Sequence, residues 1–222
     1  IQYRIELQTK VYTHVARLFL EIFMLFGGMK RFVDRNVEVR GNENWREIEK
    51  NGKGILFLSS HLGNWEIMAA AAAREGANAI IVTKLLKPLW LHQLVEKGRA
   101  RCGVRGTYEP KTLKDVLREL KKGGRIGFVL DQYAGPPVGV RVPFFDVPVG
   151  TSTALATLAR RTGAAVVPSI NYRDSDGRSI LEFGKPLEWI SREDYHEEIA
   201  VNTAHYVEHL ERFIRSHPEQ WL

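Results

Sequence analysis

Short apolar runs alternate with helical segments along most of this 222-residue sequence. The strand-like runs cover residues 37–40, 55–58, 79–83, 126–130, 165–170 and 179–183, and the helical segments cover residues 43–50, 65–75, 88–101, 112–122, 152–161 and 195–215. Strands joined through helices need crossover connections, so this order predicts an α/β fold with a mostly parallel or mixed sheet flanked by helices. Because no linker or internal repeat interrupts it, we expect residues 37–222 to form one α/β domain after an N-terminal segment, residues 1–36.

The N-terminal segment contains a predicted amphipathic helix over residues 3–26. Its apolar residues recur at three- and four-residue spacing: Val11, Val15, Leu18, Ile22 and Leu25. Bulky side chains crowd its end, where Gly27 and Gly28 stop the helix and Lys30 and Arg31 follow. The pattern fits a helix packed on the domain and also an interfacial membrane helix. No run of about 18 apolar residues occurs, so we expect no membrane span.

Residues 59–66, SSHLGNWE, join the predicted strand at 55–58 to the helix at 65–75. Asn64 or Gly63 can cap the start of that helix. His61 then lies on the turn and Glu66 in the first helical turn, so we expect the Glu66 carboxylate to fold back onto the imidazole. A carboxylate that fixes the tautomer of a histidine makes the other ring nitrogen a general base.

Polar residues follow three of the predicted strands. His61 follows the first, Lys84 the second and Asp131 the third. Ligands of open α/β sheets bind outside the carboxyl ends of the strands. The three side chains are therefore expected to share one site.

The charge balance narrows the choice of partners. Lysine and arginine number 32 against 26 acidic residues, giving a net charge of +6, which favours an anionic partner such as a membrane surface or an acidic carrier protein. The basic residues are spread along the chain without a cluster interleaved with aromatics, so we expect no nucleic acid. Cys102 is the single cysteine, which excludes an intrachain disulfide and a thiolate metal cluster.

Residues 205–209, HYVEH, match the H-x-x-E-H pattern of an inverted zinc-peptidase site. Such a site needs a further ligand, usually much later in the chain, and few residues follow His209. An ordinary amphipathic helix is the favoured interpretation, with a metallohydrolase kept as an alternative, and we expect no metal. Phosphate-binding and hydrolase motifs (G-x-x-x-x-G-K-[ST], G-x-G-x-x-G and G-x-S-x-G) do not occur in the sequence.

Several segments together resemble the bacterial lipid A biosynthesis acyltransferases, the lauroyl- and myristoyltransferase family that also includes phosphatidylinositol mannoside acyltransferases. Residues 59–66 resemble the H-x-x-x-x-D/E motif of that family. The other matching segments, in the order and approximate spacing of the family, are LDQYAG at 130–135, VRVPFF at 140–145, TLA at 157–159, TGA at 162–164, VP at 167–168 and PEQWL at 218–222.

The resemblance implies a glycerol-phosphate acyltransferase-like architecture. It also implies transfer of a fatty acyl group from an acyl carrier protein or coenzyme A thioester to a hydroxyl of a glycolipid, at the cytoplasmic face of the bacterial inner membrane. It makes His61 and Glu66 catalytic, with Asn64, Lys84, Arg99, Asp131 and Gln132 expected to bind substrate. Backbone N–H groups near the turn or a basic side chain would hold the oxyanion.

Lys84 departs from the arginine that many members carry, and lysine offers no bidentate fork for a phosphate.

No cofactor is expected, and the partners implied are the thioester donor and anionic membrane lipid. A lipid-binding protein without turnover is the other interpretation.

Overall fold

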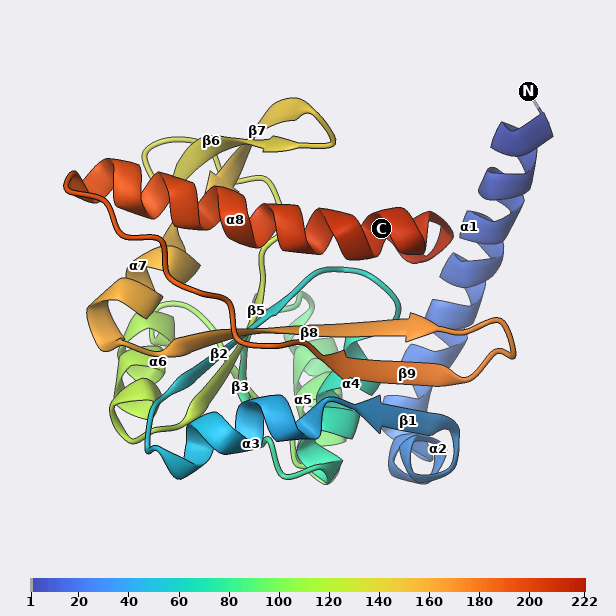
Figure 1. The fold of residues 1–222 in the computed structure, drawn as a ribbon. Helices are drawn as coiled ribbons and strands as arrows, with labels where there is room; N and C mark the ends of the chain where they lie inside the picture. Colours follow the sequence, from blue (N-terminus) through green and yellow to red (C-terminus); the bar gives the residue numbers. More distant parts are fainter. Residues whose placement is uncertain (1) are drawn as a thin grey trace.

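The computed structural model describes residues 2–222 and contains a seven-stranded sheet in the order β1-β9-β8-β2-β5-β3-β4 (Figure 1). Its strands are β1 (Val37–Arg40), β2 (Ile55–Ser59), β3 (Ile80–Val82), β4 (Arg105–Thr107), β5 (Arg125–Val129), β8 (Ala165–Arg173) and β9 (Ser179–Phe183). Neighbouring strands pair in parallel except β8 and β9, which are antiparallel. The predicted α/β fold with a mostly parallel, mixed sheet is confirmed.

Helices cover both faces of this sheet. They are α1 (Gln2–Ile22), α2 (Met29–Asn36), α3 (Asn42–Lys50), α4 (Trp65–Arg74), α5 (Leu89–Arg101), α6 (Thr112–Lys121), α7 (Ala154–Thr162) and α8 (Tyr195–Ser216). Alternate side chains of β2 enter opposite cores: Ile55 and Phe57 pack with α2 to α5, and Leu56 and Leu58 with α6 to α8. All five residues of β2 are buried, as expected for the centre of a sheet covered on both sides.

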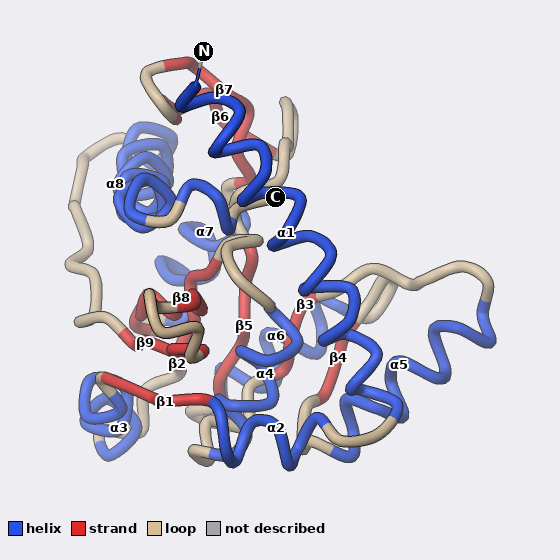
Figure 2. The backbone as a smooth tube through the Cα atoms, turned by 90° about the vertical axis from the view of Figure 1, so that its right-hand side faces the viewer, coloured by secondary structure: helices blue, strands red, loops and turns tan. Residues whose placement is uncertain are grey.

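Helix α1 packs against the body of the molecule with one face only. His14, Leu18 and Glu21 are buried, whereas Phe19 and Leu20 are exposed. Figure 2 shows α1 running diagonally across the face turned toward the viewer, with its first turns beyond the seven-stranded sheet. The helix ends at Ile22 and a 3₁₀ turn (Phe23–Phe26) follows, so the predicted helix over 3–26 has a tighter last turn. None of the described helices is long and apolar enough to cross a bilayer.

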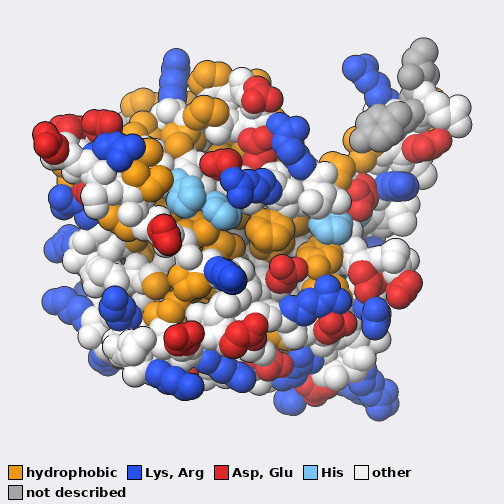
Figure 3. Space-filling model, viewed as in Figure 1, with side chains coloured by type: hydrophobic (Ala, Val, Ile, Leu, Met, Phe, Trp, Pro, Cys, Tyr) orange, Lys and Arg blue, Asp and Glu red, His pale blue; other side chains and the backbone are white. Residues whose placement is uncertain are grey.

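One helix and three strands were not predicted from the sequence: α2, the short edge strand β4, and the two strands of a hairpin, β6 (Gly139–Phe144) and β7 (Val147–Ser152). The hairpin is a separate antiparallel pair that packs on α8. After α8 the chain turns through a 3₁₀ segment (Pro218–Gln220) and returns to the sheet beside the end of β2, where Leu62 and Trp221 form a bridge. Figure 3 shows acidic and basic side chains interspersed over the face that α8 crosses.

Candidate active site

The turn between β2 and α4 is fixed by its backbone. Gly63 has φ +68°, and a Cβ there would lie 2.2 Å from the carbonyl oxygen of Asn171, so only glycine fits. Asn64 caps α4: its Oδ1 accepts hydrogen bonds from the backbone N–H of Glu66 at 3.0 Å and Ile67 at 3.2 Å. The predicted cap is confirmed, and it leaves His61 on the turn.

His61 and Asp131 form the centre of the site. The pairing of β2 with β5 ends at Ser59 and Val129 and is followed by a hydrogen bond from Leu130 N to the Ser59 carbonyl. Two residues beyond that last pair, His61 lies opposite Asp131. Asp131 Oδ1 lies 2.8 Å from His61 Nδ1, and Asp131 Oδ2 accepts from the His61 backbone N–H at 2.7 Å. The carboxylate side chain is 1% exposed and the imidazole 23%. Asp131 thus holds the ring while Nε2 stays accessible.

Glu66 does not contact His61 as the sequence predicted. Its two carboxylate oxygens instead accept from Arg99 Nε at 3.0 Å and Arg99 Nη2 at 2.5 Å, and the pair is buried. Glu66 starts α4 with its side chain toward α5, whereas Asp131 reaches the imidazole from the neighbouring strand end. The expected Glu66–His61 contact is therefore wrong, and the carboxylate that orients His61 is Asp131.

Arg99, which the resemblance made a substrate-binding residue, is held by two carboxylates of the protein itself. Glu66 and Glu96 hold three of its nitrogens. Burial opposes its charge, but the hydrogen bonds and attraction of these two carboxylates outweigh burial and raise the pKa of the guanidinium. Arg99 still lines the cavity beside His61, so it presents a fixed positive charge there.

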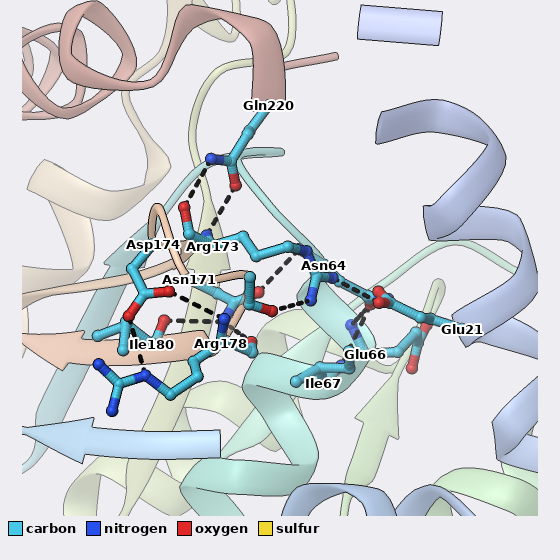
Figure 4. A network of polar contacts seen from close by, with 12 residues as sticks. Glu21, Asn64, Glu66, Ile67, Asn171, Arg173, Asp174, Arg178, Ile180 and Gln220 are labelled. Carbon is cyan, nitrogen blue, oxygen red and sulfur yellow. Dashed lines mark hydrogen bonds and ion pairs between the residues drawn. The ribbon is translucent and has the colours of Figure 1, made fainter. Parts of the chain in front are cut away.

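Asn64 is fully buried and lies in a network that Figure 4 shows. Its Nδ2 donates to Glu21 Oε2 at 3.0 Å, and its backbone N–H donates to Asn171 Oδ1 at 2.9 Å. Because Oδ1 accepts the hydrogen bonds of the helix cap, both polar atoms of the Asn64 side chain already have partners within the protein. The structure therefore makes Asn64 a residue that shapes the turn, contrary to the expected substrate contact.

A cavity of about 460 Å³ opens beside His61, between α4 and the sheet. Its walls are mostly apolar and include Phe57, Met68, Ala69, Ala72, Ile81 and Phe183. Lys84 and Gln132 also line it, and Gln132 Nε2 lies 3.5 Å from His61 Nε2. Lys84 is exposed and forms no ion pair with any residue in 2–222. The structure thus brings His61, Lys84, Gln132 and Arg99 to one cavity, and Asp131 contacts His61 beside it. The strand-end argument predicted that His61, Lys84 and Asp131 would lie close together.

The H-x-x-E-H pair has no further ligand in the part of the chain that is described. His205 and His209 lie on α8 with ring centroids 4.9 Å apart. Burial, and then the nearby His205, lowers the pKa of His209. Among residues 2–222 no group of three His, Cys, Asp or Glu side chains is placed to hold a metal ion. Val207 and Leu210 are buried in the core, as expected for an amphipathic helix.

Sequence reasoning gave no role to Trp221, Gln220 or Glu21, although all three belong to this region. Trp221 Nε1 donates to Asp131 Oδ2 at 2.9 Å. Gln220 was visible only as part of the PEQWL segment, and Glu21 as one polar residue of an amphipathic helix. A carboxylate on the packed face of α1 was the one available signal, since such a residue needs a partner when buried.

Comparison with known proteins gives consistent results. The family model for bacterial lipid A biosynthesis acyltransferases matches residues 2–222. The lipid A biosynthesis lauroyltransferase of Escherichia coli (strain K12) is 29% identical over 225 residues, covering 100% of this chain and 71% of that protein. A lipid A biosynthesis acyltransferase of Haemophilus influenzae is 23% identical, over 100% of this chain and 68% of its own.

More distant similarities extend this set. The phosphatidylinositol mannoside acyltransferase of Mycobacterium tuberculosis (strain H37Rv) is 25% identical over 175 residues, which cover 77% of this chain and 53% of that protein. Among solved structures, the 1-acyl-sn-glycerophosphate acyltransferase of Thermotoga maritima aligns with a TM-score of 0.49 and 16% identity, over 98% of this chain and 90% of that chain.

Proposed function

The chain belongs to the bacterial lipid A biosynthesis acyltransferase family, and from that premise we propose that it moves a fatty acyl group from an acyl carrier protein or coenzyme A thioester to a hydroxyl of a membrane glycolipid resembling a lipid A precursor. The observation that carries the proposal is the His61–Asp131 pair at the mouth of an apolar cavity. Acyl transfer needs a base that deprotonates the attacking hydroxyl and an apolar site that holds the fatty acyl chain of the donor.

His61 acts as the general base in the proposed reaction. With the Nδ1 proton held by Asp131, the lone pair of Nε2 takes the proton of the acceptor hydroxyl, and the oxygen attacks the thioester carbonyl. Collapse of the tetrahedral intermediate breaks the carbon–sulfur bond, and the imidazolium returns the proton to the leaving thiolate. Asp131 stabilises the imidazolium between these two steps. The products are the ester and the free thiol.

Positive charge near the reacting carbonyl comes from side chains in this proposal. The backbone N–H groups of His61, Gly63 and Asn64 donate to Asp131, Gln220 and Asn171, respectively, so they are not available for an oxyanion. Lys84 and Arg99 line the cavity and face negative charge on the substrates. In this proposal Lys84 binds a phosphate group of the substrates, and Gln132 contacts the acceptor. Glu66 holds Arg99 in its position.

The acyl chain occupies the cavity between α4 and the sheet. Its volume of about 460 Å³ lies within the range of small-molecule sites, about 300–1,000 Å³. The alanines of α4 and the side chains of Phe57 and Phe183 remove the chain from water, which supplies apolar burial as binding energy. The length of the chain that is transferred depends on how far this cavity reaches from His61.

Helix α1 supports the proposed place of the protein, peripheral on the cytoplasmic face of the inner membrane. Its packed face holds it on the domain, and a stripe on its opposite face is exposed. The stripe consists of Ile5, Tyr12, Phe19 and Leu20 on α1 and Phe23 at the start of the 3₁₀ turn that follows, each more than half exposed. Lys30 and Arg31 follow it closely in sequence. Aromatic and aliphatic bulk near basic residues favours the interface of an anionic bilayer.

Reconstitution tests the proposed function. The purified protein is added to vesicles that contain a lipid A precursor, with fatty acyl thioesters of acyl carrier protein or of coenzyme A, and acylated lipid is detected by mass spectrometry. We expect product with the wild type, and loss of product with His61→Ala at unchanged thermal stability. Binding of lipid without product from either donor would make the chain a lipid-binding protein and refute the proposal.

A further inference from the structure

Asp131 receives a hydrogen bond from the C-terminal segment as well as from His61. Its Oδ2 accepts from the indole Nε1 of Trp221 at 2.9 Å and from the backbone N–H of His61 at 2.7 Å, while Oδ1 faces His61 Nδ1. We propose that Trp221 is a positioning residue for the transfer reaction, whose indole N–H sets the orientation and the charge of Asp131 and so the basicity of His61. This inference rests on the proposed role of His61 as the base.

The backbone around Trp221 is fixed to the turn that carries His61. Gln220 contributes its carbonyl oxygen to the Gly63 backbone N–H at 2.9 Å, and Leu62 and Trp221 form an antiparallel bridge. The Gln220 side chain reaches the other way, as Figure 4 shows: its Oε1 accepts from the Arg173 backbone N–H at 2.7 Å and its Nε2 donates to the Arg173 carbonyl at 2.9 Å. The segment therefore joins the turn to the end of β8.

The indole ring is held from the side by the β6–β7 hairpin. It stacks on Phe145 with ring centroids 5.8 Å apart and meets the edge of Phe144 at 5.6 Å. Phe145 is itself held, because its backbone N–H donates to Glu211 Oε2 at 2.7 Å. A ring packed on two aromatic neighbours has little rotational freedom, so its N–H points at Asp131 without a further ordering cost.

The N–H of Trp221 matters because Asp131 is almost fully buried. A carboxylate that is 1% exposed depends on protein donors for its negative charge. The indole N–H draws part of that charge onto Oδ2, away from the oxygen that faces His61. Without it, Oδ1 attracts the imidazolium more strongly, and His61 stays protonated to a higher pH. A variant that lacks this N–H should therefore lose activity first at acidic pH, where its His61 is protonated.

The test compares two tryptophan-to-phenylalanine substitutions. Trp221→Phe keeps an aromatic ring on Phe144 and Phe145 but removes the donor. Trp189→Phe is the matched control, since Trp189 is also partly buried and donates its Nε1 to a carboxylate, Glu198 Oε1 at 3.0 Å, outside the site. We expect Trp221→Phe to lower kcat by about 10–100-fold, the loss of one hydrogen bond to a charged group, with little change in KM. The acid limb of its pH profile should move to higher pH, and Trp189→Phe should change neither.

A second measurement does not need turnover. The imidazole of His61 is titrated by NMR in both variants and the wild type, and its midpoint should move to higher pH in Trp221→Phe only. If Trp221→Phe does not fold, benzothienylalanine is placed at position 221, since it replaces only the indole N–H by sulfur. A pH profile and a His61 titration that match those of Trp189→Phe would overturn the inference. A shifted titration in a protein without transferase activity would refute the proposed function alone.

Discussion

Glu21 on α1 and Asn64 at the turn of the active site share a buried hydrogen bond of 3.0 Å. The same carboxylate accepts from Arg173 Nη2 at 2.5 Å, so one residue of the N-terminal helix joins the start of α4 to the end of β8 (Figure 4). The stripe of α1 that we assign to the membrane and the turn that carries His61 are thus held in a fixed relationship. A helix that served only to attach the protein to lipid would not need this contact.

Glu21→Ala should destabilise the whole domain. Glu21 and Arg173 have side chains only 7% and 14% exposed, and removing one partner of a buried pair typically costs about 3–5 kcal/mol. For a protein of this size the melting temperature should fall by roughly 10 °C. Glu208→Ala is the control, because its ion pair with Arg212 is exposed and should contribute little. Equal melting temperatures for the two variants would contradict the role given to Glu21.

His14, which lies near Glu21 and Arg173, should make the stability of the protein depend on pH. Burial, followed by the positive charge of Arg173, lowers the pKa of His14. The unfolded chain then binds a proton at this residue before the folded protein does, so stability falls as pH drops below about 6.5, the ordinary value, toward the lowered one. His14→Gln should show a flatter decline of melting temperature between neutral pH and about pH 5. The other histidines titrate in both proteins, so parallel curves would show that His14 does not contribute.

Asp131→Asn should abolish most turnover without unfolding the protein. The amide keeps the shape of the carboxylate, but its NH₂ can donate to His61 Nδ1 and leave the proton on Nε2, the nitrogen that must act as the base. We expect kcat to fall by about 10³–10⁴-fold, the effect of the wrong tautomer in hydrolases with a related pair. Asp115→Asn makes the same change on α6, where Asp115 accepts from Thr107 Oγ1, and should leave kcat unchanged. More than a tenth of wild-type kcat in Asp131→Asn would exclude Asp131 as the partner of His61.

The sequence predicted the position of His61 but not its partner, for a physical reason. The capped turn is a local feature: a buried strand, a glycine, Asn64 and a helix follow one another within a few residues. The partner depends on which strand lies beside β2, and Asp131 is separated from His61 by 70 positions. Glu66 was the carboxylate closest in sequence, and α4 directs it toward Arg99 on α5 instead.

The unpredicted elements are those that tertiary contacts stabilise. The β6–β7 hairpin contains Pro143 and Pro148 and packs on α8, so its own residues carry a weak strand signal. Trp221 lies in a short segment whose structure comes from Asp131, Phe144 and Phe145, and no local pattern predicts such a contact. The strands of the main sheet were predictable because their buried apolar runs reflect the core on both faces.

Glu66 and Arg99 should behave as one unit in unfolding experiments. Glu66→Gln leaves a buried guanidinium with less compensation, and Arg99→Met leaves a buried carboxylate, so each single variant should lose stability. The double variant should lose less than the sum, with a coupling of about 1–3 kcal/mol in urea denaturation. The same cycle on Lys30 and Asp34, an exposed pair on α2, should give about 0.5 kcal/mol or less. Additive losses at Glu66 and Arg99 would mean that the two residues act independently.

Charge placed on the exposed stripe of α1 should release the protein from membranes. Phe19 and Phe23 are 59% and 63% exposed, and burying one such side chain contributes about 1.5–3 kcal/mol. Phe19→Glu and Phe23→Glu should each weaken sedimentation with vesicles that contain anionic lipid by about tenfold or more. Leu113→Glu is the control, because Leu113 is 60% exposed on α6, outside the stripe.

Salt separates the two contributions to this binding. Attraction to anionic headgroups is screened over about 10 Å at 0.1 M salt, so the wild type should bind less at high ionic strength and keep a salt-insensitive remainder. That remainder is the apolar part, and the glutamate variants should lack it, whereas Leu113→Glu should keep it. If the glutamate variants of the stripe and the control sedimented equally at every salt concentration, the stripe would not be the surface that contacts lipid. The role of α1 would then be limited to packing against the domain.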